Sequence, residues 1–131
     1  GGMTRPEGAA ALVLARLQPL AAFGHFDGAV PIGIAAESPH TIYYPSPAQP
    51  MARKASGKAK SLLGFGSVVC VNNNPAGAVK LAALVVDLLD GWQMTDGSLV
   101  RCSTGPAIRD PDMQAGYCWS ATVQISYYLT R

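Results

Sequence analysis

The chain has 131 residues, enough for one domain with a hydrophobic core of its own. Charged residues make up only 14% of it, against about 25% in typical soluble proteins, and hydrophobic residues make up 49%. The net charge of +2 is too small to predict nucleic-acid binding, and no run of about 18 apolar residues predicts a membrane helix. A chain so poor in charge has much neutral surface, which favours association with other proteins.

The first predicted element is a helix near the start of the chain. Thr4 and Glu7 have the spacing of a capping box, and Pro19 should end the helix near Gln18. The apolar face at helical spacing consists of Ala10, Val13, Leu14 and Leu17. Gly1 and Gly2 look like an expression scar, so we expect a single domain over residues 3–131.

Two short strands are predicted next. Residues 23–26 can form the first, with Asp27 and Gly28 as a turn. Residues 41–44 can form the second, which Pro45 and Pro47 should stop.

Residues 46–60 differ from their surroundings because they contain prolines, serines and bases but no acid. The four bases are Arg53, Lys54, Lys58 and Lys60. The composition predicts a long, mobile, positively charged loop at the tip of a large hairpin, since residues 62–71 resume as a strand. It suits a segment that becomes ordered on a partner, and the alternative is a solvated loop without one. No aromatic residues are interleaved with the bases, so specific nucleic-acid binding is not expected.

A second helix is predicted from residue 76 to residue 89. Asn74 can cap its start, Pro75 suits the first helical position, and Gly91 after Asp90 suits a left-handed end. The apolar face consists of Ala78, Leu81, Ala82, Val85, Leu88 and Leu89. A strand at residues 99–103 and a loop at 105–116 should follow.

Residues 117–130 alternate without interruption, the pattern of a strand with one buried face. The apolar side consists of Tyr117, Trp119, Ala121, Val123, Ile125, Tyr127 and Leu129. The other side carries no charge, and its hydroxyls and amide can bind a neighbouring surface without burying a charge. Thr122, Gln124 and Tyr128 on that side are candidate contacts. Together, these elements predict an α+β fold: a mostly antiparallel sheet of four to five strands with two helices packed on one face.

No motif for catalysis, metal binding or cofactor binding is found. The pair Gly57 and Lys58 resembles the end of a phosphate-binding loop, but Ala52 and Ala59 stand where that loop needs glycine and a hydroxyl residue. We therefore expect no enzyme, no catalytic residue, no cofactor and no metal. The remote alternative is a small α/β hydrolase or ligand-binding domain that uses Cys102 or Cys118.

Four segments carry a resemblance to a known family, and they span nearly the whole chain. They are residues 24–28 (GHFDG), 39–46 (PHTIYYPS), 66–71 (GSVVCV) and Gly105-Pro106 with Arg109-Asp110 before the tyrosine-rich final strand. In this layout the chain resembles the tail terminator, or tail-completion, proteins of long-tailed bacteriophages, a group of minor tail proteins.

The resemblance implies a structural role without catalysis. Tail terminators form a hexameric ring on the head-proximal end of the tail tube, stop tube polymerisation and present a surface for head joining. The implied partners are other copies of the chain, the major tail tube protein and a head-completion or connector protein, with no membrane involved. The implied location is the virion tail, after assembly in the host cytoplasm.

A head–tail connector or another minor tail protein of similar size is the closest alternative, because the sequence alone separates these roles poorly. The residues that we expect to bind partners are Arg53, Lys54, Lys58, Lys60, Thr122, Gln124 and Tyr128.

Overall fold

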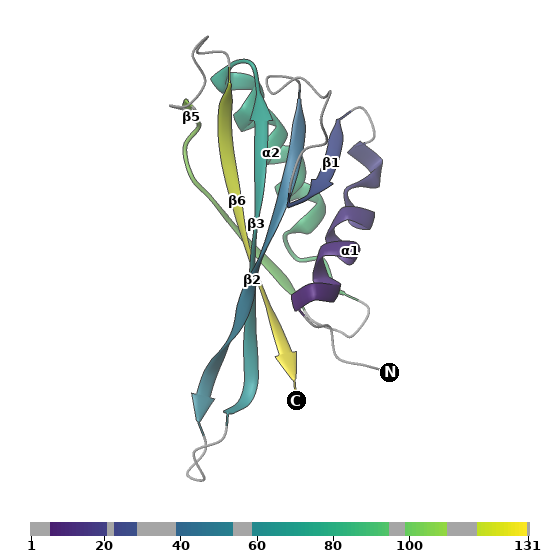
Figure 1. Cartoon of the computed structure of the whole chain (residues 1–131), viewed down its shortest axis with the longest axis vertical. Helices are drawn as coiled ribbons and strands as arrows, with labels where there is room; N and C mark the ends of the chain where they lie inside the picture. Colours follow the sequence, from purple (N-terminus) through teal and green to yellow (C-terminus); the bar gives the residue numbers. More distant parts are fainter. Residues whose placement is uncertain are drawn as a thin grey trace.

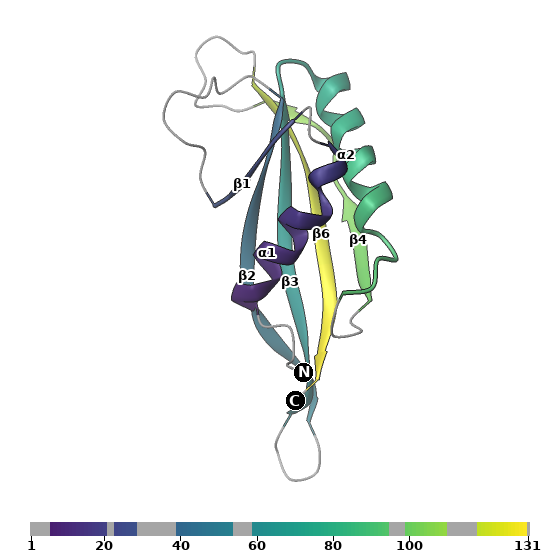
Figure 2. The same cartoon turned by 90° about the vertical axis from the view of Figure 1, so that its right-hand side faces the viewer.

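A computed structural model describes residues 6–20, 23–28, 39–53, 59–94, 99–109 and 118–130. One layer is a sheet, and two α-helices cover a single face of it (Figures 1 and 2). The elements are α1 (Pro6–Arg16), a 3-10 turn η1 (Gln18–Leu20), β1 (Gly24–Asp27), β2 (His40–Arg53), β3 (Ala59–Asn72), α2 (Pro75–Leu89), β4 (Val100–Thr104), β5 (Ile108–Arg109) and β6 (Trp119–Thr130).

The sheet has the strand order β1-β2-β3-β6-β4, and β5 also pairs with β6. Only β1 and β2 are parallel. The predicted α+β class with helices on one face is confirmed, but the sheet has six strands and not four to five. The strand that the prediction missed is β5, which lies within the loop expected at 105–116. Two residues are too few to show a period of two, so a strand of this length leaves no pattern in the sequence.

The prediction that Pro45 stops the second strand was wrong, because β2 runs on to Arg53. Gly28 donates its N–H to the carbonyl of Tyr43, so Tyr43 turns its backbone toward β1. Pro45 lies two residues further and faces the same side, where β1 has already ended. A proline is tolerated there because no neighbouring strand needs its missing N–H. Pro47 lies at a bulge between Ser46 and Gln49, the other place where strands accept proline.

The long basic loop is therefore mostly a hairpin. β2 and β3 pair as far as Arg53 opposite Ala59, and this hairpin extends past both helices (Figure 1). Arg53 and Lys60 lie in its strands, and only their backbone is described. Lys54 and Lys58 lie outside the described residues, as does Thr4 of the predicted capping box.

The two helices form from the predicted signals. Asn74 caps α2 by accepting a hydrogen bond of 2.6 Å from the Gly77 N–H, and Gly91 takes the left-handed conformation with φ of 77° after its end. α1 ends at Arg16 and continues as the turn η1, which contains Pro19.

Arg16 connects the two helices at their ends. Its Nε donates a hydrogen bond of 2.9 Å to the carbonyl of Leu88, and its guanidinium lies 5.6 Å from the centre of the Trp92 ring. Because the last carbonyls of a helix lack intrahelical partners, this cation stabilises the end of α2.

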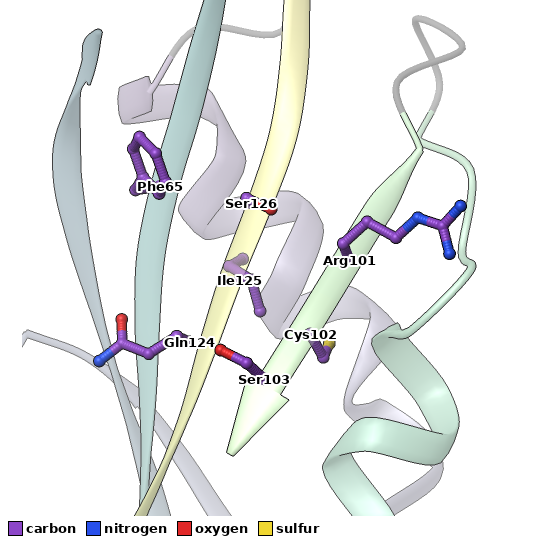
Figure 3. Close-up of a pocket in the computed structure, with 7 residues that line it drawn as sticks. All are labelled: Phe65, Arg101, Cys102, Ser103, Gln124, Ile125 and Ser126. Atoms are coloured by element: carbon purple, nitrogen blue, oxygen red, sulfur yellow. The ribbon is translucent and has the colours of Figure 1, made fainter. Parts of the chain in front are cut away.

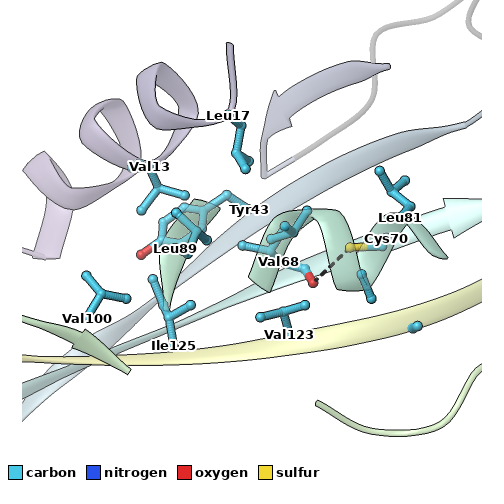
Figure 4. Close-up of a cluster of buried hydrophobic side chains, with 14 of the residues drawn as sticks. Val13, Leu17, Tyr43, Val68, Cys70, Leu81, Leu89, Val100, Val123 and Ile125 are labelled. Carbon is cyan, nitrogen blue, oxygen red and sulfur yellow. Dashed lines mark hydrogen bonds between the residues drawn. The ribbon is translucent and has the colours of Figure 1, made fainter. Parts of the chain in front are cut away.

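The core lies between the helices and the sheet (Figure 4). Its largest side chains are Tyr43 from β2 and Tyr127 from β6, both fully buried. Burial raises the pKa of Tyr43 far above its ordinary value, and the neighbouring Tyr127 phenol raises it further.

Glycines on β3 make room for both rings. A Cβ added at Gly66 would overlap the Tyr43 phenol, and one added at Gly64 would overlap the Tyr127 ring. Since both aromatic residues and both glycines face the helices, the centre of the sheet depends on a strip of β3 without side chains.

We predict that Gly66→Ala destabilises the protein by about 1–3 kcal/mol, because the added methyl group overpacks the core. Tyr43→Phe should recover part of this loss in the double variant, since it removes the phenol oxygen that lies nearest the new methyl group. Chemical denaturation measures both effects. Gly105→Ala is the matched control, because an added Cβ there meets no atom within 4 Å. Equal stability of the Gly66 and Gly105 variants would contradict the prediction.

Candidate interaction face

The side of the sheet opposite the helices carries the candidate site. Along β6 the side chains of Ala121, Val123 and Ile125 are buried toward the helices, whereas Thr122 is half-buried and Gln124 is exposed on the other side. The alternation predicted for this strand is confirmed over these residues. No described helix covers this second side, which we call the open face (Figures 1 and 2).

Strand register aligns the open face into rows that cross the sheet. The row at the centre combines one aromatic residue, two hydroxyls and one amide: Tyr44, Ser67, Gln124 and Ser103. The Ser67 hydroxyl donates a hydrogen bond of 2.8 Å to Oε1 of Gln124. One neighbouring row contains Ser46, Phe65, Ser126 and Arg101, and the other contains Ile42, Val69 and Thr122.

The open face is nearly free of charge. Among its described side chains, Arg101 is the one Asp, Glu, Lys or Arg residue. Hydroxyls, an amide and aromatic rings can be covered by another protein without removing charges from water, a step that costs several kcal/mol per ion. Composition of this kind is typical of the centre of a protein–protein interface.

A hollow of about 220 Å³ lies on this face between β3, β6 and β4 (Figure 3). Figure 3 shows Arg101 extending away from the hollow and Gln124 extending toward β3. Its lining consists of Phe65, Arg101, Cys102, Ser103, Gln124, Ile125 and Ser126. It is smaller than typical small-molecule pockets, which measure about 300–1,000 Å³, so it fits a side chain of a partner better than a free ligand.

The structure places the predicted partner-binding residues in two groups. Thr122 and Gln124 lie on the open face, two residues apart on β6. Arg53 and Lys60 lie at the far end of the β2–β3 hairpin, away from that pair (Figure 1). Tyr128 lies opposite Leu63 on β3, with only its backbone described.

Several residues of the face were missed by sequence reasoning, notably Phe65, Arg101 and Ser103. The alternation of β4 groups Arg101 with Ser103, but only the register between strands places them beside Ser126 and Gln124. That register is not visible in the sequence of a single strand.

The cysteines and His25 have surroundings that suit structural roles. Burial raises the pKa of the Cys70 thiol to about 12; burial and the nearby Asp90 carboxylate raise that of Cys102 to about 11. The two ring nitrogens of His25 lie 2.7 Å from Oγ1 of Thr41 and 2.9 Å from the carbonyl of Leu20, so this imidazole joins η1 to β2.

Within the part of the chain that the structure describes, no three His, Cys, Asp or Glu side chains are grouped so that they could hold a metal ion. The described helices are too short or too polar to cross a membrane.

Comparisons with known proteins show similarity of fold. No family model and no curated protein sequence matches the chain. A solved protein structure whose name states no function superposes with a TM-score of 0.61 and 19% identity, over 96% of this chain and 94% of the other. A chain from the virion of a native gene transfer agent particle superposes with a TM-score of 0.58 and 17% identity, over 93% and 94%. The shared property is the fold.

We predict that the Cys102 thiol reacts slowly with iodoacetamide at pH 7, about 100-fold more slowly than an ordinary cysteine, because a pKa near 11 leaves little thiolate. The rate should rise about tenfold per pH unit toward pH 10. Protein unfolded in urea is the control, and mass spectrometry locates the label. Rapid, selective labelling of one cysteine in the folded protein at pH 7 would contradict this and favour the hydrolase alternative.

Proposed function

We propose that this chain is a structural protein of a virion, and that it acts as a tail terminator. It would cap the head-proximal end of the tail tube, stop tube polymerisation and form the surface to which the head is joined. The observation that carries this proposal is the fold, shared over nearly the full length of both chains with a component of a gene transfer agent virion. The sequence resemblance to tail terminators supplies the specific role.

The open face suits such a role physically. Capping requires a surface that competes with the next tube subunit for the same contacts, and no bond is made or broken. A face whose described side chains include a single charge can be buried at low desolvation cost. The Ser67–Gln124 hydrogen bond holds the amide in place before binding, which reduces the entropy lost on contact.

Self-association into a ring, as a hexamer, is the second part of the proposal. A ring uses two different patches on each subunit, which meet head to tail. The low overall charge of the chain favours such contacts.

The third part of the proposal concerns the β2–β3 hairpin and its four bases. Its extension past the helices makes it accessible to a partner, and its cations Arg53, Lys54, Lys58 and Lys60 favour an acidic surface on the tube or head-completion protein.

A head–tail connector is the alternative, because joining a head to a tail also needs a surface that another protein can cover. Electron microscopy of particles that lack the protein separates the two roles. Overlong tails would support the terminator, whereas heads without tails would support the connector.

We expect Gln124→Lys and Thr122→Lys to weaken capping of purified tail tubes at least tenfold, because each places an unpaired cation on the open face. Tube length after addition of tube subunits measures capping. Ala11→Lys adds the same charge at an exposed position on α1 and should have no effect. If the Gln124→Lys variant caps tubes as well as the Ala11→Lys control does, β6 is a core strand only.

Replacing all four hairpin bases by glutamine should reduce partner binding more than stability, since the hairpin end contributes little to the core. The remaining binding should also lose most of its salt dependence. Binding to purified tubes at two salt concentrations, together with thermal unfolding, checks this. Equal losses of binding and stability would mean that the hairpin is structural.

The mass of the assembled protein and its ability to cap tail tubes test the proposal as a whole. Native mass spectrometry with and without tube protein should show a ring, and the protein should stop tube growth. A monomer under all conditions, together with a failure to cap tubes, would refute it.

A further inference from the structure

The two edges of the sheet differ in shape. β1 forms one edge, and β4 and β5 lie at the other. At the second edge, α2 and the end of β4 enclose a notch of about 120 Å³, room for roughly four waters or one aliphatic side chain. Small apolar groups line it: Val79, Ala82, Ala83, Thr104, Gly105 and Ala121.

Exposed apolar side chains lie along the edge that bears the notch. Val79 on α2 is 50% exposed and lines the notch, and Ile108 on β5 is 60% exposed. Leu99, directly before β4, is also exposed, but it lies at the end of β4 away from the notch. Of the four large apolar side chains that are exposed in the described residues, only Tyr44 lies toward the other edge. Val79 and Ile108 are the exposed apolar side chains nearest the notch, Val79 on the helix layer and Ile108, paired with Ser120, on the side of the open face.

Strand register places the notch and Asp27 at opposite edges of the sheet. One row across the sheet begins at Asp27 on β1 and ends at Thr104 on β4. Between them lie Tyr43, Val68 and Val123, all buried toward the helices. Asp27 and Thr104 are therefore on the helix-facing side at opposite ends of one row.

The two edges of the sheet carry charges of opposite sign. Asp27 is exposed beside Gly28, where the chain leaves β1. At the other edge the exposed Arg109 on β5 pairs with Trp119, two residues along β6 from Ala121 of the notch. Lys80 and Asp87 on α2 and Asp90 directly after it are also exposed, and Arg101 belongs to the open face.

We propose that a second copy of this chain occupies the notch edge: the β1 edge of one copy docks onto the α2–β4–β5 edge of the next, with Asp27 facing Arg109. The inference rests on the proposed self-association and names the surfaces that make it. Because the two surfaces differ, the contact is heterologous and builds a ring or a filament, not a two-fold dimer.

Charge exchange between copies is the decisive experiment. Asp27→Arg alone and Arg109→Asp alone should each weaken self-association at least tenfold, because each sets like charges against each other. An equimolar mixture of the two variants should restore it, since every contact in an alternating assembly then joins opposite charges. An alternating ring needs an even number of subunits, which a hexamer satisfies. Native mass spectrometry and sedimentation measure the masses, and thermal unfolding confirms that both variants fold.

The notch is tested by Val79→Glu, which should weaken association at least tenfold. Ala15→Glu is the matched control, because Ala15 is exposed at the end of α1 beside Arg16, which contacts α2. If the wild type associates and the Asp27, Arg109 and Val79 variants associate equally well, this interface is wrong. The proposed ring would then have to form through other surfaces. Association that stops at two copies would also overturn it. A wild type that stays monomeric at millimolar concentration would overturn it as well, and tube capping would then decide the proposed function separately.

Discussion

The close approach of two tyrosines to two glycines of β3 is the constraint on which the rest of the fold depends. Tyr43 and Tyr127 fill the core only because Gly66 and Gly64 leave the centre of β3 bare. A slip of one residue in either pairing would set Phe65 or Ser67 against a ring, so the glycines specify the register of the three long strands. The same register assembles the open face, because every row on that side is set by the pairing that buries the tyrosines.

Much of this fold could be predicted from local patterns. α2 has a complete set of signals, with Asn74 before it and Gly91 after it, and β6 alternates over its whole length. Prediction failed where the deciding factor was the neighbour and not the strand itself. Whether Pro45 ends β2 depends on where β1 stops, and the two residues of β5 form a strand only because β6 is there to pair with them.

The candidate site, too, could be predicted where one strand determines it and not where several strands combine. Thr122 and Gln124 were predictable because a single strand places them together. Phe65, Ser103 and Arg101 come from two other strands and meet them only through cross-strand register. The thiols of Cys70 and Cys102 are distinguished from reactive cysteines by burial, a property of the packed molecule that spacing in the sequence does not encode.

The hydrogen bonding along the edges of the sheet limits how this protein can assemble. Beyond β1, the outer side of β2 lacks an amide donor at Pro45 and is bulged at Pro47. On β4, the Val100 N–H is taken by the Trp92 carbonyl and the Cys102 N–H by the Asp90 carboxylate. Neither stretch offers a free row of donors to an incoming strand, so the uncontrolled edge-to-edge growth that leads to amyloid is discouraged. Binding along these two stretches must then use side chains, whose shape and charge limit it to the correct partner and let growth stop at a finite size.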